Sequence, residues 1–351
     1  MTATATTALI YWRRIPRLGR IILSKLVLIV PQMFGVTLVT FLLVRLLPGD
    51  PTRLILGNFA TEQSIALYRE RLGLDQPLWT QFGIYLSNVL HGDLGSSPFT
   101  SNPILTDLSE RAPATLELIV YAMALTLILG VGIAVIAVVK SGGMVDIASR
   151  IYGLAAGAIP DFWMALLLIF LFFHILGWAP APFGRIDPML LTPPTVTGFY
   201  TIDSLIARDW HAFWSSAGRL VLPVLTLTIV NAGAMMKMAQ TVFGNIYQSE
   251  FVRNMRACGL TEGQIIRSAL RNSLPPIISL ASFIFGFLLG AAVLVETIFS
   301  WGGLGQYAVQ AVINSDYAAL QGFVLVASAF ILVVYSIADI LYEIVDPRIR
   351  I

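Results

Sequence analysis

The sequence predicts an all-α, polytopic membrane protein with six transmembrane helices. Hydrophobic residues make up 57% of the chain and charged residues only 12%, whereas a soluble domain carries about 25% charged residues. The hydrophobic residues are also gathered into runs that are long enough to cross the roughly 30 Å of hydrocarbon in a bilayer. Helices are the expected form of these runs, because a helix satisfies all of its backbone polar groups internally.

Six apolar runs are expected to form the membrane-spanning helices. They lie at residues 26–47, 114–139, 151–176, 220–242, 277–300 and 320–344. Proline interrupts three of these runs, at Pro31, Pro160 and Pro223, which neighbouring helices can tolerate in a membrane. Two glycine pairs spaced four residues apart, at 153/157 and 286/290, favour close packing between helices.

The distribution of lysine and arginine predicts that both termini are cytoplasmic, because most of the 22 basic residues then fall on inner segments. The expected order of segments is a basic cytoplasmic segment (1–25), a first transmembrane helix (26–47), an extracytoplasmic segment (48–112), a core with five helices (113–344) and a cytoplasmic tail (345–351). A surface helix is expected at 61–72. Within the core we expect an extracytoplasmic cap (178–218) and a cytoplasmic loop (243–276).

The polar, basic stretch 250–276 separates two long apolar runs. Its first part has the spacing of a short amphipathic helix. The apolar face is expected to hold Phe251, Met255 and Cys258, and the opposite face Arg253 and Arg256. Gly259 is placed to end this helix, because glycine adopts the left-handed backbone at least cost.

A second helix is expected to begin at Thr261, since Gln264 follows at the spacing of a capping box. It is expected to end before Pro275, because a residue that precedes proline is pushed out of the α region. Two interpretations of the whole stretch stay open on this pattern. It is either a docking element for another protein or an ordinary loop whose arginines only set topology.

Several kinds of chemistry lack support in the sequence. The chain contains no phosphate-binding G-x-x-x-x-G-K-[ST] motif, no H-E-x-x-H and no G-x-S-x-G. Its three histidines (His91, His174 and His211) lack ligand spacing, and a single cysteine forms no internal disulfide. The net charge of +2 does not suggest nucleic acid. We therefore expect no catalytic residues, no metal site and no cofactor bound by this chain.

Three carboxylates lie within the expected spans. Asp161 follows Pro160, and an aspartate at the centre of a membrane helix costs about 2.5–3.5 kcal/mol, so such residues usually face a cavity or a partner. Asp161 either lines a translocation pathway or caps the broken helix. Glu117 and Glu296 lie toward the outer ends of their spans. These glutamates either line the pathway or are solvated at the membrane interface.

Seven segments, taken together, resemble the integral membrane permease subunits of bacterial ABC importers in the dipeptide, oligopeptide and nickel group. These segments are Leu-Leu-Pro-Gly-Asp-Pro (46–51), Gly-Leu-Asp-Gln-Pro-Leu-Trp-Thr-Gln-Phe (73–82), His-Gly-Asp-Leu-Gly (91–95), Arg-Ala-Pro-Ala-Thr-Leu-Glu-Leu (111–118), Thr-Gly-Phe-Tyr-Thr-Ile-Asp (197–203), Glu-Thr-Ile-Phe-Ser-Trp-Gly-Gly-Leu-Gly (296–305) and Asp-Pro-Arg-Ile-Arg (346–350). The resemblance implies the permease fold of type I ABC importers.

The resemblance also implies a role for the stretch that begins at residue 250. In this family the corresponding loop carries the EAA motif, which docks in a groove of the ATPase subunit. Met255 replaces an alanine of the family pattern, and Cys258 replaces a lysine. The residues implied in coupling to the ATPase are Glu250, Arg253, Met255, Arg256, Ala257, Cys258, Gly259 and Leu260.

The family resemblance implies partners as well. ATP and Mg²⁺ are expected on one or two separate ABC ATPase subunits. A second permease subunit is expected to complete the pathway, and an extracytoplasmic solute-binding protein to deliver cargo to a chain embedded in the lipid of a bacterial plasma membrane. Peptides are the expected cargo, although relatives carry nickel chelates, opines or glycosides. The alternatives are an ion-coupled secondary transporter that uses Asp161, and a membrane scaffold or receptor without transport.

Overall fold

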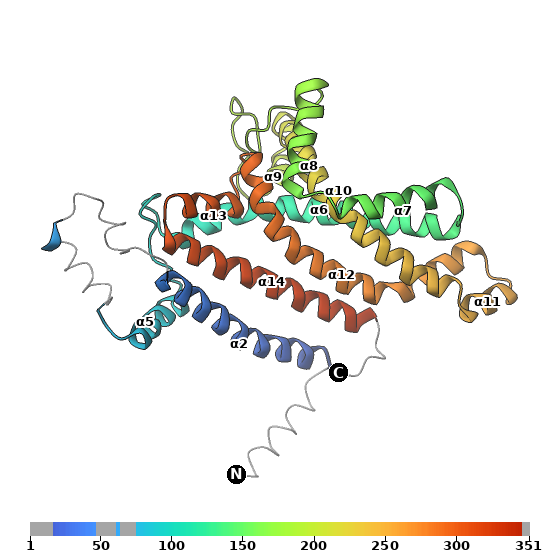
Figure 1. Ribbon diagram of the computed structural model, residues 1–351, viewed down its shortest axis with the longest axis horizontal. Helices are drawn as coiled ribbons and strands as arrows, with labels where there is room; N and C mark the ends of the chain where they lie inside the picture. Colours follow the sequence, from blue (N-terminus) through green and yellow to red (C-terminus); the bar gives the residue numbers. More distant parts are fainter. Residues whose placement is uncertain (1–16, 47–60, 64–74, 346–351) are drawn as a thin grey trace, which may run out of the picture.

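The computed structural model describes residues 17–46, 61–63 and 75–345 (Figure 1). Every regular element in these residues is a helix. Five helices are long and apolar enough to cross a membrane, and a sixth span results if one sharply bent pair of helices is counted as one. The predicted all-α, multi-span class is thus confirmed. Most of the expected surface helix at 61–72 and most of the terminal segments lie outside the described residues.

The long helices lie alongside one another (Figure 1). They are α2 (Arg17–Leu46), α6 (Ile104–Val139), α10 (Trp210–Tyr247), α12 (Glu262–Ile298) and α14 (Tyr317–Val345). The shorter elements are α5 (Leu78–Leu90), α7 (Met144–Ala156), α8 (Asp161–Leu168), the π-helical segment η1 (Ile169–Ile175), α9 (Tyr200–Ala207), α11 (Glu250–Ala257) and α13 (Leu304–Ile313). Helices α5 and α13 lie toward one end of the bundle, hereafter the α13 end, and α11 marks the other, the α11 end.

Helix α10 lies at the centre of the packing, with α6, α7 and α12 around it. Leu227 and Met235 of α10 are fully buried in the main core. Close approach is required on two sides of this helix. A Cβ on Gly130 of α6 would lie 2.8 Å from the Met235 side chain, and a Cβ on Gly233 would lie 2.6 Å from the Cβ of Ala156. Small residues therefore set the distance between α10 and its neighbours.

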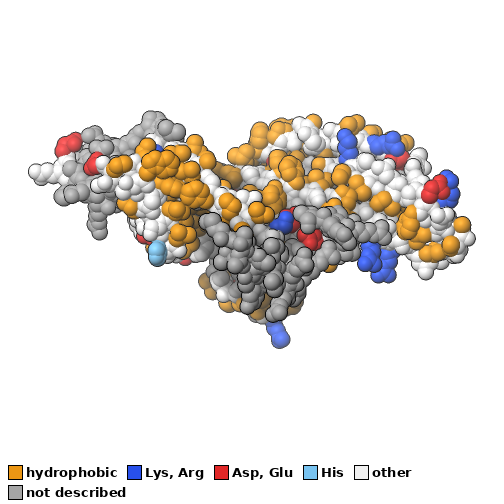
Figure 2. Space-filling model, turned by 90° about the horizontal axis from the view of Figure 1, so that it is seen from below, with side chains coloured by type: hydrophobic (Ala, Val, Ile, Leu, Met, Phe, Trp, Pro, Cys, Tyr) orange, Lys and Arg blue, Asp and Glu red, His pale blue; other side chains and the backbone are white. Residues whose placement is uncertain are grey.

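The outer helices leave long apolar faces exposed. Only 6% of the apolar window in α14 and 17% of that in α2 are buried, against 67% in α10. On the face shown in Figure 2, hydrophobic side chains extend along the bundle, while lysine and arginine gather toward the α11 end. The exposed apolar faces fit contact with lipid, because hydrocarbon does not penalise apolar surface as water does.

The third predicted span, residues 151–176, is not one straight helix. Helices α7 and α8 meet at an angle of 112°, and α8 projects away from the long helices (Figure 1). The break occupies Gly157–Pro160, where glycine disfavours the helix and proline lacks an N–H for it. The second span also differs, since its helix begins at Ile104 and includes Pro113 rather than starting at Ala114.

The expectation that a helix ends before Pro275 is wrong. Helix α12 continues through Pro275 and Pro276 to Ile298. Two prolines remove two backbone donors from the helix, but Pro275 and the following Ile277 are buried against neighbouring helices. Packing within the bundle thus outweighs the local preference of proline, as other membrane helices permit.

Candidate functional site

Helix α11 and the turn after it are determined by local backbone signals. Gly259 has φ +77°, and its N–H donates to the carbonyl of Arg256 at 3.0 Å. The N–H of Leu260 donates to the carbonyl of Met255 at 3.2 Å. This pair of bonds is the Schellman motif, which needs a left-handed residue after the helix. The predicted helix end at Gly259 is confirmed.

The start of α12 is also as predicted. The N–H of Thr261 donates to Oε1 of Gln264 at 3.0 Å, which is one half of a capping box. The hydroxyl of Thr261 donates to the same oxygen at 3.0 Å. The turn between the two helices is therefore held from both sides, and it joins α11 to a helix of 37 residues.

The buried face of α11 differs from the predicted one. Val252 is fully buried, and Met255 packs in the same cluster, against Phe243 of α10 and Ile265 of α12. Phe251 is 47% exposed. Cys258 is also exposed. The expected apolar face of Phe251, Met255 and Cys258 is wrong for its first and last members, because the short helix turns Val252 toward the bundle.

Arg256 ties α11 to both neighbouring helices. Its Nε donates to Oε1 of Glu262 at 2.8 Å, and its guanidinium lies 4.9 Å from the ring centre of Tyr247. The Tyr247 hydroxyl donates to the same carboxylate at 2.9 Å. The hydrogen bond that Arg256 donates to the Glu262 carboxylate raises the pKa of Arg256. These side chains form a polar clamp, the Arg256–Glu262 clamp, on the exposed surface.

Of the remaining coupling residues, Leu260 is half-buried and packs in the same cluster as Val252, whereas the others face outward. Glu250 and Arg253 form an exposed ion pair within α11, with 2.8 Å between Oε1 and Nη1. Ala257 and Gly259 are exposed as well. One face of α11 is thus anchored by Val252 and Met255, and the other presents a charged and apolar surface to solvent.

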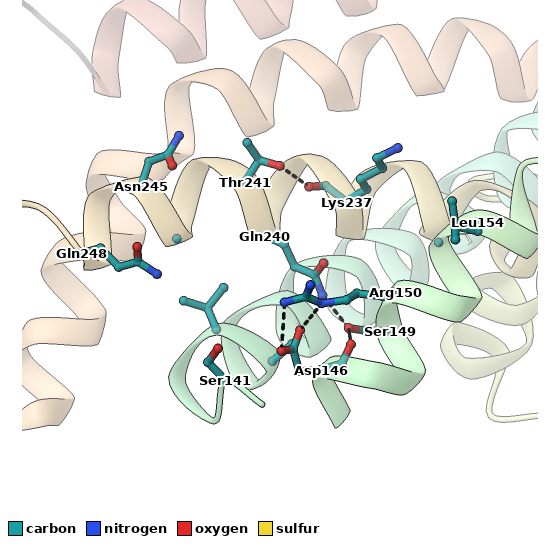
Figure 3. A pocket seen from close by; sticks show the side chains of 14 residues that line it. Ser141, Asp146, Ser149, Arg150, Leu154, Lys237, Gln240, Thr241, Asn245 and Gln248 are labelled. Atoms are coloured by element: carbon teal, nitrogen blue, oxygen red, sulfur yellow. Dashed lines mark hydrogen bonds and ion pairs between the residues drawn. The ribbon is translucent and has the colours of Figure 1, made fainter. Parts of the chain in front are cut away.

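A polar cavity of about 450 Å³ lies beside this region, between the ends of α6, α7 and α10 (Figure 3). Arg150 of α7 pairs with Asp146 at 2.9 Å (Nε to Oδ1). Gln240 of α10 donates to the Ser149 hydroxyl at 2.7 Å. Further polar side chains of the lining are Ser141, Lys237, Thr241, Asn245 and Gln248. Such a lining is unusual in a chain so rich in apolar residues.

The side of this cavity that α10 provides is a line of polar residues. Its members Gln248, Asn245, Thr241 and Lys237 are exposed and spaced three or four residues apart, so they share a face of the helix. Farther along α10, Asn231 donates to Oδ1 of Asp161 at 3.4 Å. The bend between α7 and α8 thus brings Asp161 to α10. The sequence analysis missed this line, although the helical spacing of its polar residues could have revealed it.

Glu117 lies in a buried network at the other end of the bundle. Its side chain is 2% exposed, and its Oε2 accepts a hydrogen bond from Nη2 of Arg185 at 2.5 Å. Its Oε1 accepts from the N–H and the hydroxyl of Thr201, at 3.0 and 2.7 Å. The Arg185 guanidinium stacks 3.7 Å from the ring centre of Tyr200. Glu117 thereby fastens the segment 176–209, hereafter the cap segment, to α6, while residues 210–218 of the expected cap form the start of α10.

Within the cap segment, Asp203 organises the loop before α9. Its carboxylate accepts hydrogen bonds from the N–H groups of Val196, Thr197 and Gly198, at 3.2, 2.8 and 2.9 Å. The Thr197 hydroxyl donates to it at 2.7 Å. Burial alone would raise the pKa of Asp203, but these hydrogen bonds together outweigh it and hold the pKa below its usual value.

Glu296 is fully buried near the start of α13. Its oxygens accept from the Thr115 hydroxyl at 2.6 Å and from the N–H of Gln306 at 3.1 Å. A negative charge is favourable beside the free N–H groups of a helix N-terminus. A Cβ on Gly303 would lie 2.6 Å from this carboxylate, so the glycine is needed for the approach. Neither Glu117 nor Glu296 is accessible to solvent in this structure, whereas Asp161 is partly exposed.

The described residues contain no group of three or more His, Cys, Asp or Glu side chains that could hold a metal ion. A bundle of membrane-length helices, with an exposed short helix at one end and a polar cavity open to the surface between the ends of α6, α7 and α10, fits the class of membrane transport subunits. Residues 96–351 match the family described as binding-protein-dependent transport system inner membrane component, and residues 18–129 match its N-terminal region. The chain therefore belongs to this family of type I ABC permeases, whose members are not themselves catalytic.

Curated relatives match over nearly their whole length. The chain is 36% identical over 332 residues to the dipeptide transport system permease protein DppB of Alkalihalophilus pseudofirmus, covering 93% of this chain and 98% of the relative. It is 38% identical over 316 residues to the probable D,D-dipeptide transport system permease protein DdpB of Escherichia coli, covering 90% and 93%. It is 37% identical over 331 residues to the di/tripeptide transport system permease protein DppB of Pseudomonas aeruginosa, covering 94% and 98%.

Proposed function

We propose that this chain forms half of the transmembrane pathway of an ATP-driven importer for peptides. The observation that carries the proposal is α11, a preformed helix anchored on one face and exposed on the other. The sequence lacks a phosphate-binding loop, so the energy must come from another subunit. The names of the relatives, which include dipeptide and di/tripeptide permeases, support peptides over nickel chelates, opines or glycosides.

In this proposal the α11 end faces the cytoplasm of a bacterial cell, together with both termini. The lysines and arginines gathered toward that end (Figure 2) support the orientation. Helix α11 docks in a groove of an ABC ATPase subunit, which holds ATP and Mg²⁺. The outward side chains of Glu250, Arg253, Ala257 and Cys258 contact the ATPase, while Met255 and Leu260 hold α11 to the bundle.

Movement of the ATPase subunits then reaches the membrane as rigid-body motion. The Schellman turn at Gly259 and the cap at Thr261 join α11 firmly to α12. Helix α12 extends from this turn to Ile298. Near its end, Glu296 accepts a hydrogen bond from the N–H of Gln306 at the start of α13. A displacement of α11 is thereby passed along the length of the bundle to the α13 end, where the cap segment faces an extracytoplasmic solute-binding protein.

We place the pathway along the polar line of α10 rather than at Glu117 or Glu296. Those two glutamates act as structural groups, because their oxygens are occupied by hydrogen-bond donors within the chain. Lys237 and Thr241 lie within the expected span 220–242, and polar side chains exposed on a membrane helix face a water-filled path or a protein partner, since hydrocarbon would leave them unpaired. Asp161 lies beyond the end of this line that is farther from α11, and a second permease subunit closes the open side of the path.

The test is uptake and ATP hydrolysis in liposomes that hold the complete importer with its binding protein. In the Gly259→Pro variant, proline cannot adopt φ +77°, so we expect ATP hydrolysis to continue while peptide uptake falls by at least tenfold. The matched control is Gly263→Ala, in the first turn of α12, where a Cβ meets nothing within 4 Å; it should transport normally.

Three results would overturn the proposal. Wild-type uptake in the Gly259→Pro variant would remove the coupling role of α11. Solute movement by the purified chain alone, driven by an ion gradient, would instead support a secondary transporter that uses Asp161. If uptake does not respond to loss of ATP hydrolysis in the complete complex, a scaffold or receptor role is favoured.

A further inference from the structure

A second hollow lies on a different side of the bundle, between α6, α12 and α14. Its volume is about 580 Å³. Leu127 and Val131 of α6, Leu274 and Phe285 of α12, and Ile337 of α14 are among its lining residues. The only hydroxyl in the lining belongs to Ser282, which donates to the backbone carbonyl of Ser279 at 2.8 Å. The groove therefore offers no free polar group to an occupant.

The groove is long enough for a single hydrocarbon chain. Along α12 it extends from Leu270 to Phe285, which is about 22 Å at the rise of an α-helix. One leaflet contributes about 15 Å of hydrocarbon, half of the bilayer core. An unbranched chain that enters from one leaflet can therefore lie along the groove, and the lining offers a protein partner no free hydrogen-bonding group.

The end of the groove nearest α11 carries two arginines. Arg267 and Arg271 are one helical turn apart, and with Leu270, Leu274 and Ile278 they share one face of α12. Both arginines are exposed. Neither has an ion pair or a hydrogen bond from its side chain to another described residue. Two cations thus stand at the mouth of an apolar groove.

The nearby acidic groups of α14 turn away from this mouth. Asp339 pairs with Lys25 of α2, with 2.6 Å between Oδ2 and Nζ. Glu343 lies four residues after Asp339 and therefore on the same face of α14, whereas Ala338 and Leu341 face the groove. The described surroundings of Arg267 and Arg271 leave their positive charge without a counter-ion.

We propose that this groove binds an anionic phospholipid of the leaflet at the α11 end. One acyl chain lies between α6, α12 and α14, and the headgroup phosphate accepts hydrogen bonds from Arg267 and Arg271. Guanidinium groups match the geometry of phosphate oxygens, and basic pockets between membrane helices are suited to anionic headgroups. The site concerns the lipid around the importer and does not depend on which solute the importer carries. A lipid bound in this groove would pack against α12 near its start, close to the turn that joins α12 to α11.

Native mass spectrometry of the full-length protein in its permease complex tests this site. The complex is exchanged in detergent against equal amounts of phosphatidylglycerol and phosphatidylcholine before measurement. We expect the wild-type complex to retain phosphatidylglycerol in preference. In the Arg267→Gln/Arg271→Gln double variant, the ratio of retained phosphatidylglycerol to phosphatidylcholine should fall roughly tenfold, because each basic residue near the surface attracts anionic lipid. Arg208→Gln, at an exposed arginine of the α13 end, is the matched control and should retain the lipid.

A second variant tests the acyl chain separately. Ala281→Phe places a ring in the groove and should lower the retention of both lipids, while the thermal midpoint of the complex reports whether the variant folds. Equal retention of phosphatidylglycerol by the double variant and the wild type would overturn the proposal. A photo-crosslinking residue at Ile128 that labels the second permease subunit, and not lipid, would overturn it as well.

Discussion

Two ion pairs join separate elements at opposite ends of the bundle, and they differ in burial. The Glu117–Arg185 pair, between α6 and the cap segment, is 2% and 10% exposed. The Arg256–Glu262 clamp, between α11 and α12, is 44% and 56% exposed. Buried charges are costly unless all their partners are present, whereas exposed pairs are screened by water and salt. Loss of either partner of the Glu117–Arg185 pair is therefore expected to cost more stability than loss of the Arg256–Glu262 clamp.

The apolar contacts of the two regions follow the same division. Near the Glu117–Arg185 pair, between α12 and α13, Trp301 is 2% exposed and donates from its indole N–H to the carbonyl of Ala114 at 2.9 Å. Helix α11 has a single fully buried side chain, Val252. Regions that transmit motion are drawn from the less stable parts of a protein. The comparison predicts that substitutions at Glu117 and in the cap segment lower the stability of the fold. Substitutions in α11 are predicted to affect the coupling of ATP hydrolysis to uptake.

The largest loss of stability is expected from Glu117→Ala. This change leaves the buried Arg185 without its carboxylate, and removing one partner of a buried pair costs about 3–5 kcal/mol. The thermal midpoint of the purified protein should fall clearly. A double variant with Arg185→Ala should recover part of the loss, because no unpaired charge then remains. A midpoint equal to that of the wild type would contradict the interpretation that Glu117 fastens the cap segment to α6.

A smaller and more local loss is expected from Asp203→Asn. The amide offers one acceptor oxygen where the carboxylate has two, so some of the donors at Val196, Thr197 and Gly198 lose their partner. Each unsatisfied buried group costs about 1–3 kcal/mol. Faster hydrogen exchange should appear in the cap segment and not in α11. If hydrogen exchange in the cap segment is equally fast in the wild type and the variant, the carboxylate does not organise this loop.

The pH dependence of the same residue has a definite sign. The folded-state pKa of Asp203 lies below the unfolded value of 3.8, so its contribution is fully present above that value and is lost as the pH falls through the folded pKa. The difference in thermal midpoint between wild type and Asp203→Asn should stay constant from about pH 8 to about pH 5 and shrink only below about pH 4. A difference that shrinks near neutral pH would be inconsistent with a lowered pKa.

The smallest effect on stability is expected from Arg256→Glu. The clamp is exposed, so its loss should leave the thermal midpoint nearly unchanged. The substitution places two like charges beside each other and turns α11 away from Glu262. Peptide uptake in the complete importer should therefore fall while membrane insertion stays normal. A large drop in midpoint with normal uptake would reverse the comparison between the two ends.

Much of the α11 region could be predicted from the sequence because its signals are local. Gly259 ends a helix through its own backbone, and Thr261 caps the next helix through Gln264, three residues away. The number of apolar runs likewise follows from composition along the chain, and the family was recognisable from short motifs in order. The buried face of α11 was not predictable, since it depends on Phe243 and Ile265 of other helices.

The carboxylates show the same limit more clearly. Glu117 meets Thr201 across 84 residues of sequence, and Glu296 meets Thr115 across 181. A sequence pattern can indicate that an acidic residue lies within a span, but not which distant donors will reach it. The pathway interpretation of these residues relied on position alone and stays a prediction, whereas their burial contradicts the alternative that they are solvated at the membrane interface.

The sequence by itself determined the all-α class, the approximate positions of the membrane-length helices and the turn that follows α11. These features depend on hydrophobicity and on hydrogen bonds between near neighbours in the chain. Only the tertiary structure decided the 112° bend between α7 and α8, the continuous helix through Pro275 and Pro276, and the burial of Glu117 and Glu296. In each of these cases, contacts between separate helices outweigh or complete the local preference, because packing and desolvation act on groups that are distant in sequence.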